Sequence, residues 1–109
     1  MEKSVVSFGC RLNTYESEVI KDIIEKVDQN VVVFNTCAVT SEAERQARQA
    51  IRRMRKENPD IKIIVTGCSA QTNPKIYESM SEVDLVLGNQ EKLKSEFYTF
   101  EDKIKVRVN

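Results

Sequence analysis

Three cysteines are the residues of this chain best suited to chemistry. Cys10, Cys37 and Cys68 are far apart in the sequence, but each comes one to three residues after the end of an apolar, strand-like run. In an open parallel sheet, ligands bind beyond the carboxyl ends of the strands. We therefore expect the fold to bring the three thiols to one edge of the sheet, where they hold a ligand.

The chemistry of three thiolates leaves several ligands open. The chain has no histidine, so the fourth ligand of a structural zinc would have to be a carboxylate or water. An iron–sulfur cluster prefers thiolates, and three protein ligands on a cubane cluster leave one iron open. A redox disulfide is less favoured, because no C-x-x-C pair is present. Alternatively, the cysteines are buried and inert, as many free cysteines are.

The elements that must position these cysteines can be read from the hydrophobic pattern. Two of the apolar runs, VVVFN and IKIIVT, are apolar on both faces, as in buried strands of a parallel sheet. Amphipathic patterns with helical spacing lie between the runs. Strands are predicted at 3–8, 31–35, 61–66, 83–87 and 104–108, and helices at 14–27, 40–57, 73–80 and about 90–97.

This alternation of strands and helices defines the fold class. It predicts an α/β domain with an open, mostly parallel sheet of four to five strands flanked by helices, a Rossmann/flavodoxin-like three-layer arrangement with right-handed crossovers. A length of 109 residues suits one compact domain.

Charge and composition exclude several classes of function. The chain has 17 basic and 17 acidic residues, so no global field favours a nucleic acid or a membrane. No apolar run approaches the length of a membrane span, and the N-terminus does not read as a signal peptide. With an odd number of widely spaced cysteines, we expect a cytoplasmic protein with reduced thiols.

One local patch of charge stands out on the predicted helix 40–57. Its apolar side chains fall on one face of the helix: Ala43, Ala47, Ala50, Ile51 and Met54. No acidic residue occurs between Arg45 and Lys56. A solvated helix face and a surface for an RNA backbone both account for this pattern. The RNA-binding candidates are Arg45, Arg48, Arg52 and Arg55.

Four segments of the chain resemble a known family. They are SFGCRLNTYESEVI, VVFNTCAVTSEAERQARQAIRRMRKENP, IVTGCSAQTNP and VDLVLGNQEKL, which together cover about residues 4–94. They are similar to the N-terminal domain of the methylthiotransferases, radical S-adenosylmethionine enzymes that insert a methylthio group into tRNA or a ribosomal protein. The segments most resemble the branch that acts on N6-threonylcarbamoyladenosine next to the tRNA anticodon.

The resemblance implies a cofactor and the residues that bind it. Cys10, Cys37 and Cys68 would hold an auxiliary [4Fe-4S] cluster with one open iron that carries the inserted sulfur. In this family a second [4Fe-4S] cluster and S-adenosylmethionine belong to a following radical domain, whose C-x-x-x-C-x-x-C motif is absent here. We therefore expect residues 1–100 to form the cluster-binding domain and 101–109 an edge strand or the start of a linker. Alone, the domain should be inactive.

Three further expectations accompany this hypothesis. The partner of the full-length protein would be tRNA, with no membrane involved, and a C-terminal RNA-binding domain would be missing from this chain. Only DQN links the first helix to VVVFNTC, where family members often carry an extra strand, so the sheet should have one strand fewer. The alternatives are a domain of the isopentenyladenosine or ribosomal protein S12 methylthiotransferases, and a non-catalytic zinc/RNA-binding module.

Overall fold

The computed structural model describes residues 3–8, 14–27, 30–36, 41–88 and 106–107 of the chain. The described strands form one sheet in which all neighbours are parallel and the spatial order follows the sequence. The strands are β1 (Lys3–Phe8), β2 (Val31–Thr36), β3 (Lys62–Thr66), β4 (Leu85–Leu87) and β5 (Val106–Arg107).

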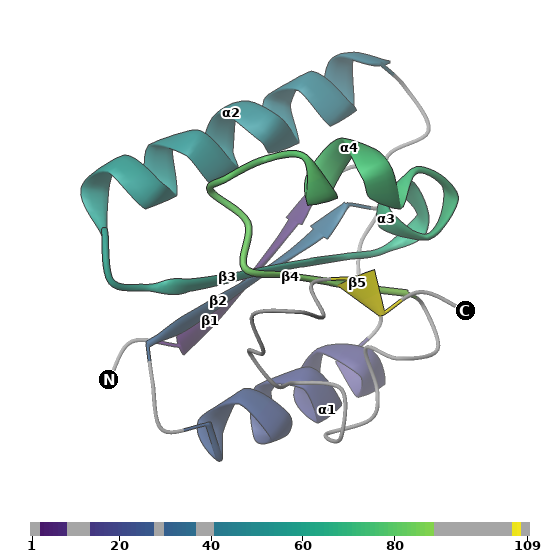
Figure 1. The fold of residues 1–109 in the computed structure, drawn as a ribbon. Coiled ribbons are helices and arrows are strands. Elements are labelled where there is room, and N and C mark those ends of the chain that lie inside the picture. The colour runs from purple at the N-terminus through teal and green to yellow at the C-terminus, as the bar shows by residue number, and fades with distance from the viewer. Residues whose placement is uncertain (1–2, 9–13, 28–29, 37–40, 89–105, 108–109) are drawn as a thin grey trace.

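Helices cover both faces of this sheet and give three layers (Figure 1). One face carries α1 (Thr14–Glu25), and the other carries α2 (Ser41–Glu57), α3 (Cys68–Thr72) and α4 (Pro74–Glu78). The predicted fold class is therefore confirmed. No helix among the described residues is long and apolar enough to cross a membrane.

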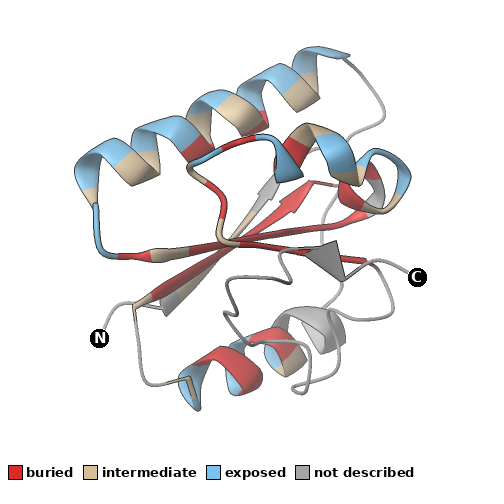
Figure 2. Cartoon of the chain, viewed as in Figure 1, coloured by how far each residue is buried: buried red, intermediate tan, exposed pale blue. Residues whose placement is uncertain are grey.

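The core has two halves, one on each side of the sheet. All six residues of β2 are buried, and their side chains alternate between the two halves because successive residues of a strand point to opposite faces. Val32 and Phe34 pack with Ile51 of α2, whereas Val31 and Val33 pack with Ile24 of α1. Figure 2 shows the buried strands between helices whose outer faces are exposed.

The first crossover has an unexpected hand. With strands in sequential order, helices on the same face give crossovers of the same hand, and helices on opposite faces give opposite hands. The connections through α2 and through α3 and α4 are right-handed, so the β1–α1–β2 connection, whose helix lies on the other face, is left-handed. The expectation that every crossover is right-handed is wrong here.

The short link after α1 explains this exception. A right-handed crossover through α1 would place the next strand on the far side of β1, away from β3. Only five residues separate the end of α1 at Glu25 from Val31, where β2 begins. Strand β2 lies directly beside β1. As expected, no extra strand lies between α1 and β2 in the described part of the chain.

The remaining predicted elements differ only in detail. Helix α3 was not expected, because five residues are too few to show a helical pattern. Its turn includes a hydrogen bond of 2.9 Å from the Gln71 amide to the Gly67 carbonyl. Strand β5 pairs with β4 at an edge of the described sheet. The helix predicted at 90–97 lies outside the described residues, and the boundary at residue 100 stays a prediction.

Candidate functional site

The ends of the first three strands lie together at the carboxyl edge of the sheet. Phe8 at the end of β1 is in register with Thr36 at the end of β2, and Asn35 is in register with Thr66 at the end of β3. Cys10 and Cys37 lie outside the described residues, two positions after Phe8 and one after Thr36. Cys68 begins α3, two residues after Thr66. The structure thus brings together the strand ends that precede all three cysteines.

The chain also leaves these strand ends in opposite directions. After β1 it continues into α1 on one face, and after β2 it continues into α2 on the other. In doubly wound sheets, such a divergence of neighbouring connections opens the crevice in which ligands bind. The left-handed first crossover therefore produces, between β1 and β2, the local arrangement that a reversal of strand order produces elsewhere.

Gly67 brings the backbone before Cys68 against the backbone before Cys37. Its φ is +108°, and an added Cβ would lie 2.7 Å from the Thr36 nitrogen and 2.7 Å from Asn35 Oδ1. No other residue fits there, because L side chains rarely adopt this backbone conformation and the Cβ would overlap the neighbouring strand. The close approach fixes the start of α3 relative to the end of β2.

Two buried threonine hydroxyls connect the ends of β2, β3 and β4. Thr36 Oγ1 donates a hydrogen bond of 2.8 Å to the Thr66 carbonyl. Thr66 Oγ1 in turn donates one of 3.4 Å to the Gly88 carbonyl. Because each hydroxyl is buried, its hydrogen bond avoids the cost of an unsatisfied polar group. This threonine ladder holds three strand ends together, and two of them, those of β2 and β3, come just before Cys37 and Cys68.

A second polar network connects the helices that follow Cys37 and Cys68. The Ser69 hydroxyl in α3 lies 2.9 Å from the hydroxyl of the buried Tyr77 in α4. Ser69 also donates a hydrogen bond of 3.2 Å to Glu44 Oε1 in the first turn of α2. The starts of α2 and α3 are therefore tied to each other as well as to the sheet.

Sequence reasoning missed these supporting residues, although the sequence held a signal. Thr36 precedes Cys37 directly, and Thr66 is separated from Cys68 by Gly67 alone. Two successive strands therefore end in a threonine that lies within two residues of a cysteine. This repeated pattern indicates a shared role. The contacts of Ser69 and Tyr77 depend on α3, which the sequence pattern did not predict.

The donor set fits an iron–sulfur cluster. Three cysteines with no histidine provide thiolates alone, which these clusters prefer. The Gly67 approach and the threonine ladder supply a rigid frame for two of the three positions. Among the described residues, which do not include the cysteine side chains, no group of three or more potential metal-binding side chains occurs.

The structure separates the basic residues of α2 into two groups. Arg45 donates a hydrogen bond of 3.1 Å to Glu42, which lowers the pKa of the Glu42 carboxyl and raises the pKa of Arg45. The Nη1 atom of Arg48 lies 3.9 Å from Oε2 of Glu44. In contrast, Arg52, Arg53 and Lys56 are exposed and make no ion pair or side-chain hydrogen bond within the described part of the chain.

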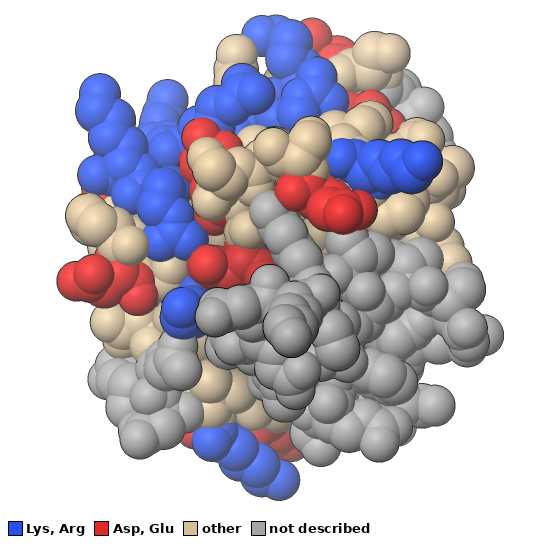
Figure 3. Space-filling view, in the orientation of Figure 1, with Lys and Arg blue, Asp and Glu red and all other residues tan. Residues whose placement is uncertain are grey.

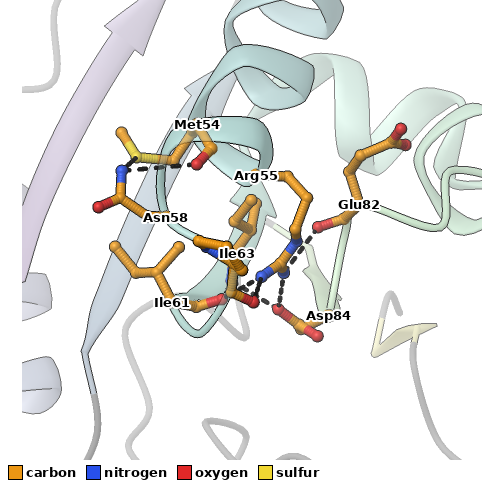
Figure 4. A network of polar contacts seen from close by, with 8 residues as sticks. Met54, Arg55, Asn58, Ile61, Ile63, Glu82 and Asp84 are labelled. Carbon is orange, nitrogen blue, oxygen red and sulfur yellow. Dashed lines mark hydrogen bonds and ion pairs between the residues drawn. The ribbon is translucent and has the colours of Figure 1, made fainter.

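Arg55 points inward, away from the exposed face of α2 (Figure 4). Its guanidinium lies 2.6 Å from Asp84 Oδ2 and donates hydrogen bonds to the carbonyls of Ile61 at 2.7 Å and Glu82 at 3.0 Å. It also reaches the Pro59 carbonyl at 2.8 Å. These contacts connect the end of α2 to the starts of β3 and β4. They give Arg55 a structural role that explains its position without RNA.

The fold and these strand ends define a class: an open parallel α/β domain whose first three strands end just before the three cysteine positions. A family model described as "Uncharacterized protein family UPF0004" matches residues 3–88. The chain belongs to this family, which forms the N-terminal domain of the methylthiotransferases.

The relatives carry specific names. The threonylcarbamoyladenosine tRNA methylthiotransferase MtaB of Rickettsia prowazekii (strain Madrid E) is 60% identical over 110 residues, which cover 100% of this chain and 26% of the relative. The protein of the same name from Aquifex aeolicus (strain VF5) is 36% identical over 84% of the chain and 25% of its own length. A tRNA-2-methylthio-N(6)-dimethylallyladenosine synthase of Finegoldia magna (strain ATCC 29328 / DSM 20472 / WAL 2508) is 36% identical over 78% of the chain and 22% of its length. The chain thus spans about a quarter of the length of these relatives.

Proposed function

We propose that this chain is the auxiliary [4Fe-4S] cluster-binding domain of a tRNA methylthiotransferase that modifies N6-threonylcarbamoyladenosine next to the anticodon. The observation that carries the proposal is the register of β1, β2 and β3, whose ends meet immediately before Cys10, Cys37 and Cys68. The choice of nucleoside rests on identity, which is 60% to a threonylcarbamoyladenosine enzyme and 36% to a dimethylallyladenosine enzyme.

In this proposal the chain's own residues bind and orient the cluster. The thiolates of Cys10, Cys37 and Cys68 are ligands and not nucleophiles. Gly67, the threonine ladder and the Ser69–Tyr77 pair hold the backbone next to two of these ligands, Cys37 and Cys68. When bound, the cluster would supply an iron without a cysteine ligand. This iron would carry the sulfur that is inserted into the substrate.

The rest of the reaction belongs to the remainder of a full-length enzyme. We propose that the full-length enzyme is a cytoplasmic transferase. It would also bind the second [4Fe-4S] cluster, S-adenosylmethionine and tRNA. The isolated chain should not modify tRNA by itself, because it lacks the C-x-x-x-C-x-x-C motif of the radical centre.

The test is anaerobic reconstitution of the chain with iron and sulfide. About four irons and four sulfides per chain are expected, with one iron distinct in Mössbauer spectra because it lacks a thiolate. Cys10→Ala, Cys37→Ala and Cys68→Ala should each lose stable binding, whereas Ser41→Ala, an exposed change at the start of α2, should not. A full four-iron cluster in all three cysteine variants, or zinc as the only metal retained, would contradict the proposal.

A further inference from the structure

The exposed basic face at the C-terminal end of α2 is a candidate interaction surface. Figure 3 shows Lys and Arg side chains gathered over this helix. We propose that Arg52, Arg53 and Lys56, here called the basic triad, bind the phosphate backbone of an RNA at a distance from the cysteine edge. The inference rests on the proposed function only in naming RNA as the polyanion that the triad binds.

Within the described part of the chain, the triad is the part of α2 whose positive charges have no acidic partner. Arg45 and Arg48 lie beside Glu42 and Glu44, and Arg55 is engaged with Asp84 and backbone carbonyls. The triad residues have no such partners among the described residues. Of the four arginines predicted to bind RNA, Arg52 is a member of the triad, and Arg53 and Lys56 complete it. RNA binding by Arg45, Arg48 and Arg55 stays a prediction.

The three side chains of the triad share one surface of α2. Arg52 and Lys56 are one helical turn apart, and Arg53 is three residues before Lys56, so the three side chains leave neighbouring positions of one rigid helix surface. Guanidinium groups provide forked donors that match phosphate oxygens. The helix dipole accounts for cations in the last turn, such as Lys56. It does not require Arg52 and Arg53, which lie further from the end.

The triad lies at the end of α2 that is remote from the carboxyl edge of the sheet. Helix α2 runs antiparallel to the strands, so it begins near the carboxyl edge and ends at the opposite edge of the sheet. At about 1.5 Å per residue, Arg52 to Lys56 lie roughly 16–23 Å along the axis from Ser41. An RNA that reaches both ends of the helix spans about five to seven nucleotides at the roughly 3.4 Å per nucleotide of a duplex strand. The triad would thus anchor tRNA away from the modified base.

The experiment compares two variants of the chain that lose the same charge. The test variant is Arg52→Gln/Arg53→Gln/Lys56→Gln. The control is Lys21→Gln/Lys26→Gln/Lys75→Gln, which removes three exposed cations: one in α1, one directly after α1 and one in α4. Binding of a labelled tRNA transcript is followed by fluorescence anisotropy at several salt concentrations, with circular dichroism to establish that both variants are folded.

The test variant should bind tRNA at least tenfold more weakly in low salt. The slope of log K against log salt should fall in magnitude by about 2–3, since each lost phosphate contact removes about 0.7–0.9. The control should stay within about twofold of the parent chain. Unchanged binding by the test variant, or an equal loss in the control, would overturn the proposal. Triad-dependent binding to anionic lipid vesicles as tight as to tRNA would also overturn it.

The outcome is independent of the cysteine site. Both variants keep Cys10, Cys37 and Cys68, so iron and sulfide content after reconstitution should match the parent chain. Failure to bind a cluster together with triad-dependent tRNA binding would contradict the proposed function alone. A complete cluster with triad-independent tRNA binding would contradict only the RNA surface.

Discussion

At the scale of single residues, Gly67 has the tightest geometric constraint at the carboxyl edge. Gly67→Ala would force a methyl group to 2.7 Å from the Thr36 nitrogen in a backbone conformation reserved for glycine. The strained backbone alone should cost roughly 1–3 kcal/mol of the free energy of unfolding. Urea denaturation measures this loss, and Lys75→Ala, an exposed change in α4, serves as the control. Stability equal to the parent chain would contradict the close approach.

The Ser69–Tyr77 pair gives a second residue-scale prediction. Tyr77→Phe and Ser69→Ala should each lower the free energy of unfolding by about 1 kcal/mol, because each removes a hydrogen bond that the buried hydroxyls share. The double variant should lose less than the sum of the two, since it leaves no hydroxyl of the pair without its partner. Strict additivity in a double-mutant cycle would show that the two hydroxyls do not interact.

If the pair orients the start of α3, its loss should also appear in the cluster. Reconstituted Tyr77→Phe should keep its iron content but show an altered reduction potential or faster bleaching in air, because the backbone at Cys68 is less constrained. A variant that is destabilised yet has an unchanged potential and bleaching rate would limit the pair to a structural role.

At the scale of elements, the end of α2 is fastened to the sheet by Arg55. Arg55→Ala should cost about 1–3 kcal/mol, because it removes the donor to three carbonyls and one of the two donors to Asp84 Oδ2, which keeps only the Ile63 amide. Arg52→Ala on the exposed face is the matched control and should change stability by less than about 0.5 kcal/mol. Arg55→Lys should recover only part of the loss, since an ammonium group cannot reproduce the forked contacts. Equal effects of Arg55→Ala and Arg52→Ala would remove the structural role.

The elements themselves were largely predictable from the sequence, for identifiable reasons. Fully apolar runs such as VVVFN read as buried strands, and the alanine and isoleucine face of α2 read as a packed helix. Helix α3 and the opposite roles of Arg52 and Arg55 were not predictable, because they depend on the turn at Gly67 and on where Asp84 lies. Side chains at similar helical spacing look equivalent until their tertiary neighbours are known.

At the scale of the whole molecule, sheet position should govern local stability. Strands β2 and β3 are paired on both sides and buried between helices, whereas β1 pairs with β2 alone among the described residues. Native-state hydrogen exchange should therefore protect the amides of Val32–Phe34 and Ile63–Val65 more strongly than those of Val5 and Val6. Equal protection across these strands would indicate that β1 is covered by another part of the chain.

The hand of the first crossover has a consequence for how this domain tolerates change. Because α1 already lies where a right-handed connection would run outward from β1, a longer segment between Val27 and Val31 could cross to the outer side of β1 and return without disturbing the other strands. A grafted strand of about six residues, followed by a return connection of a dozen or more residues to the amino end of β2, should then extend the sheet by one position and make the connection through α1 right-handed. The handedness of the connection between β1 and β2 thus determines where this sheet could gain a further strand.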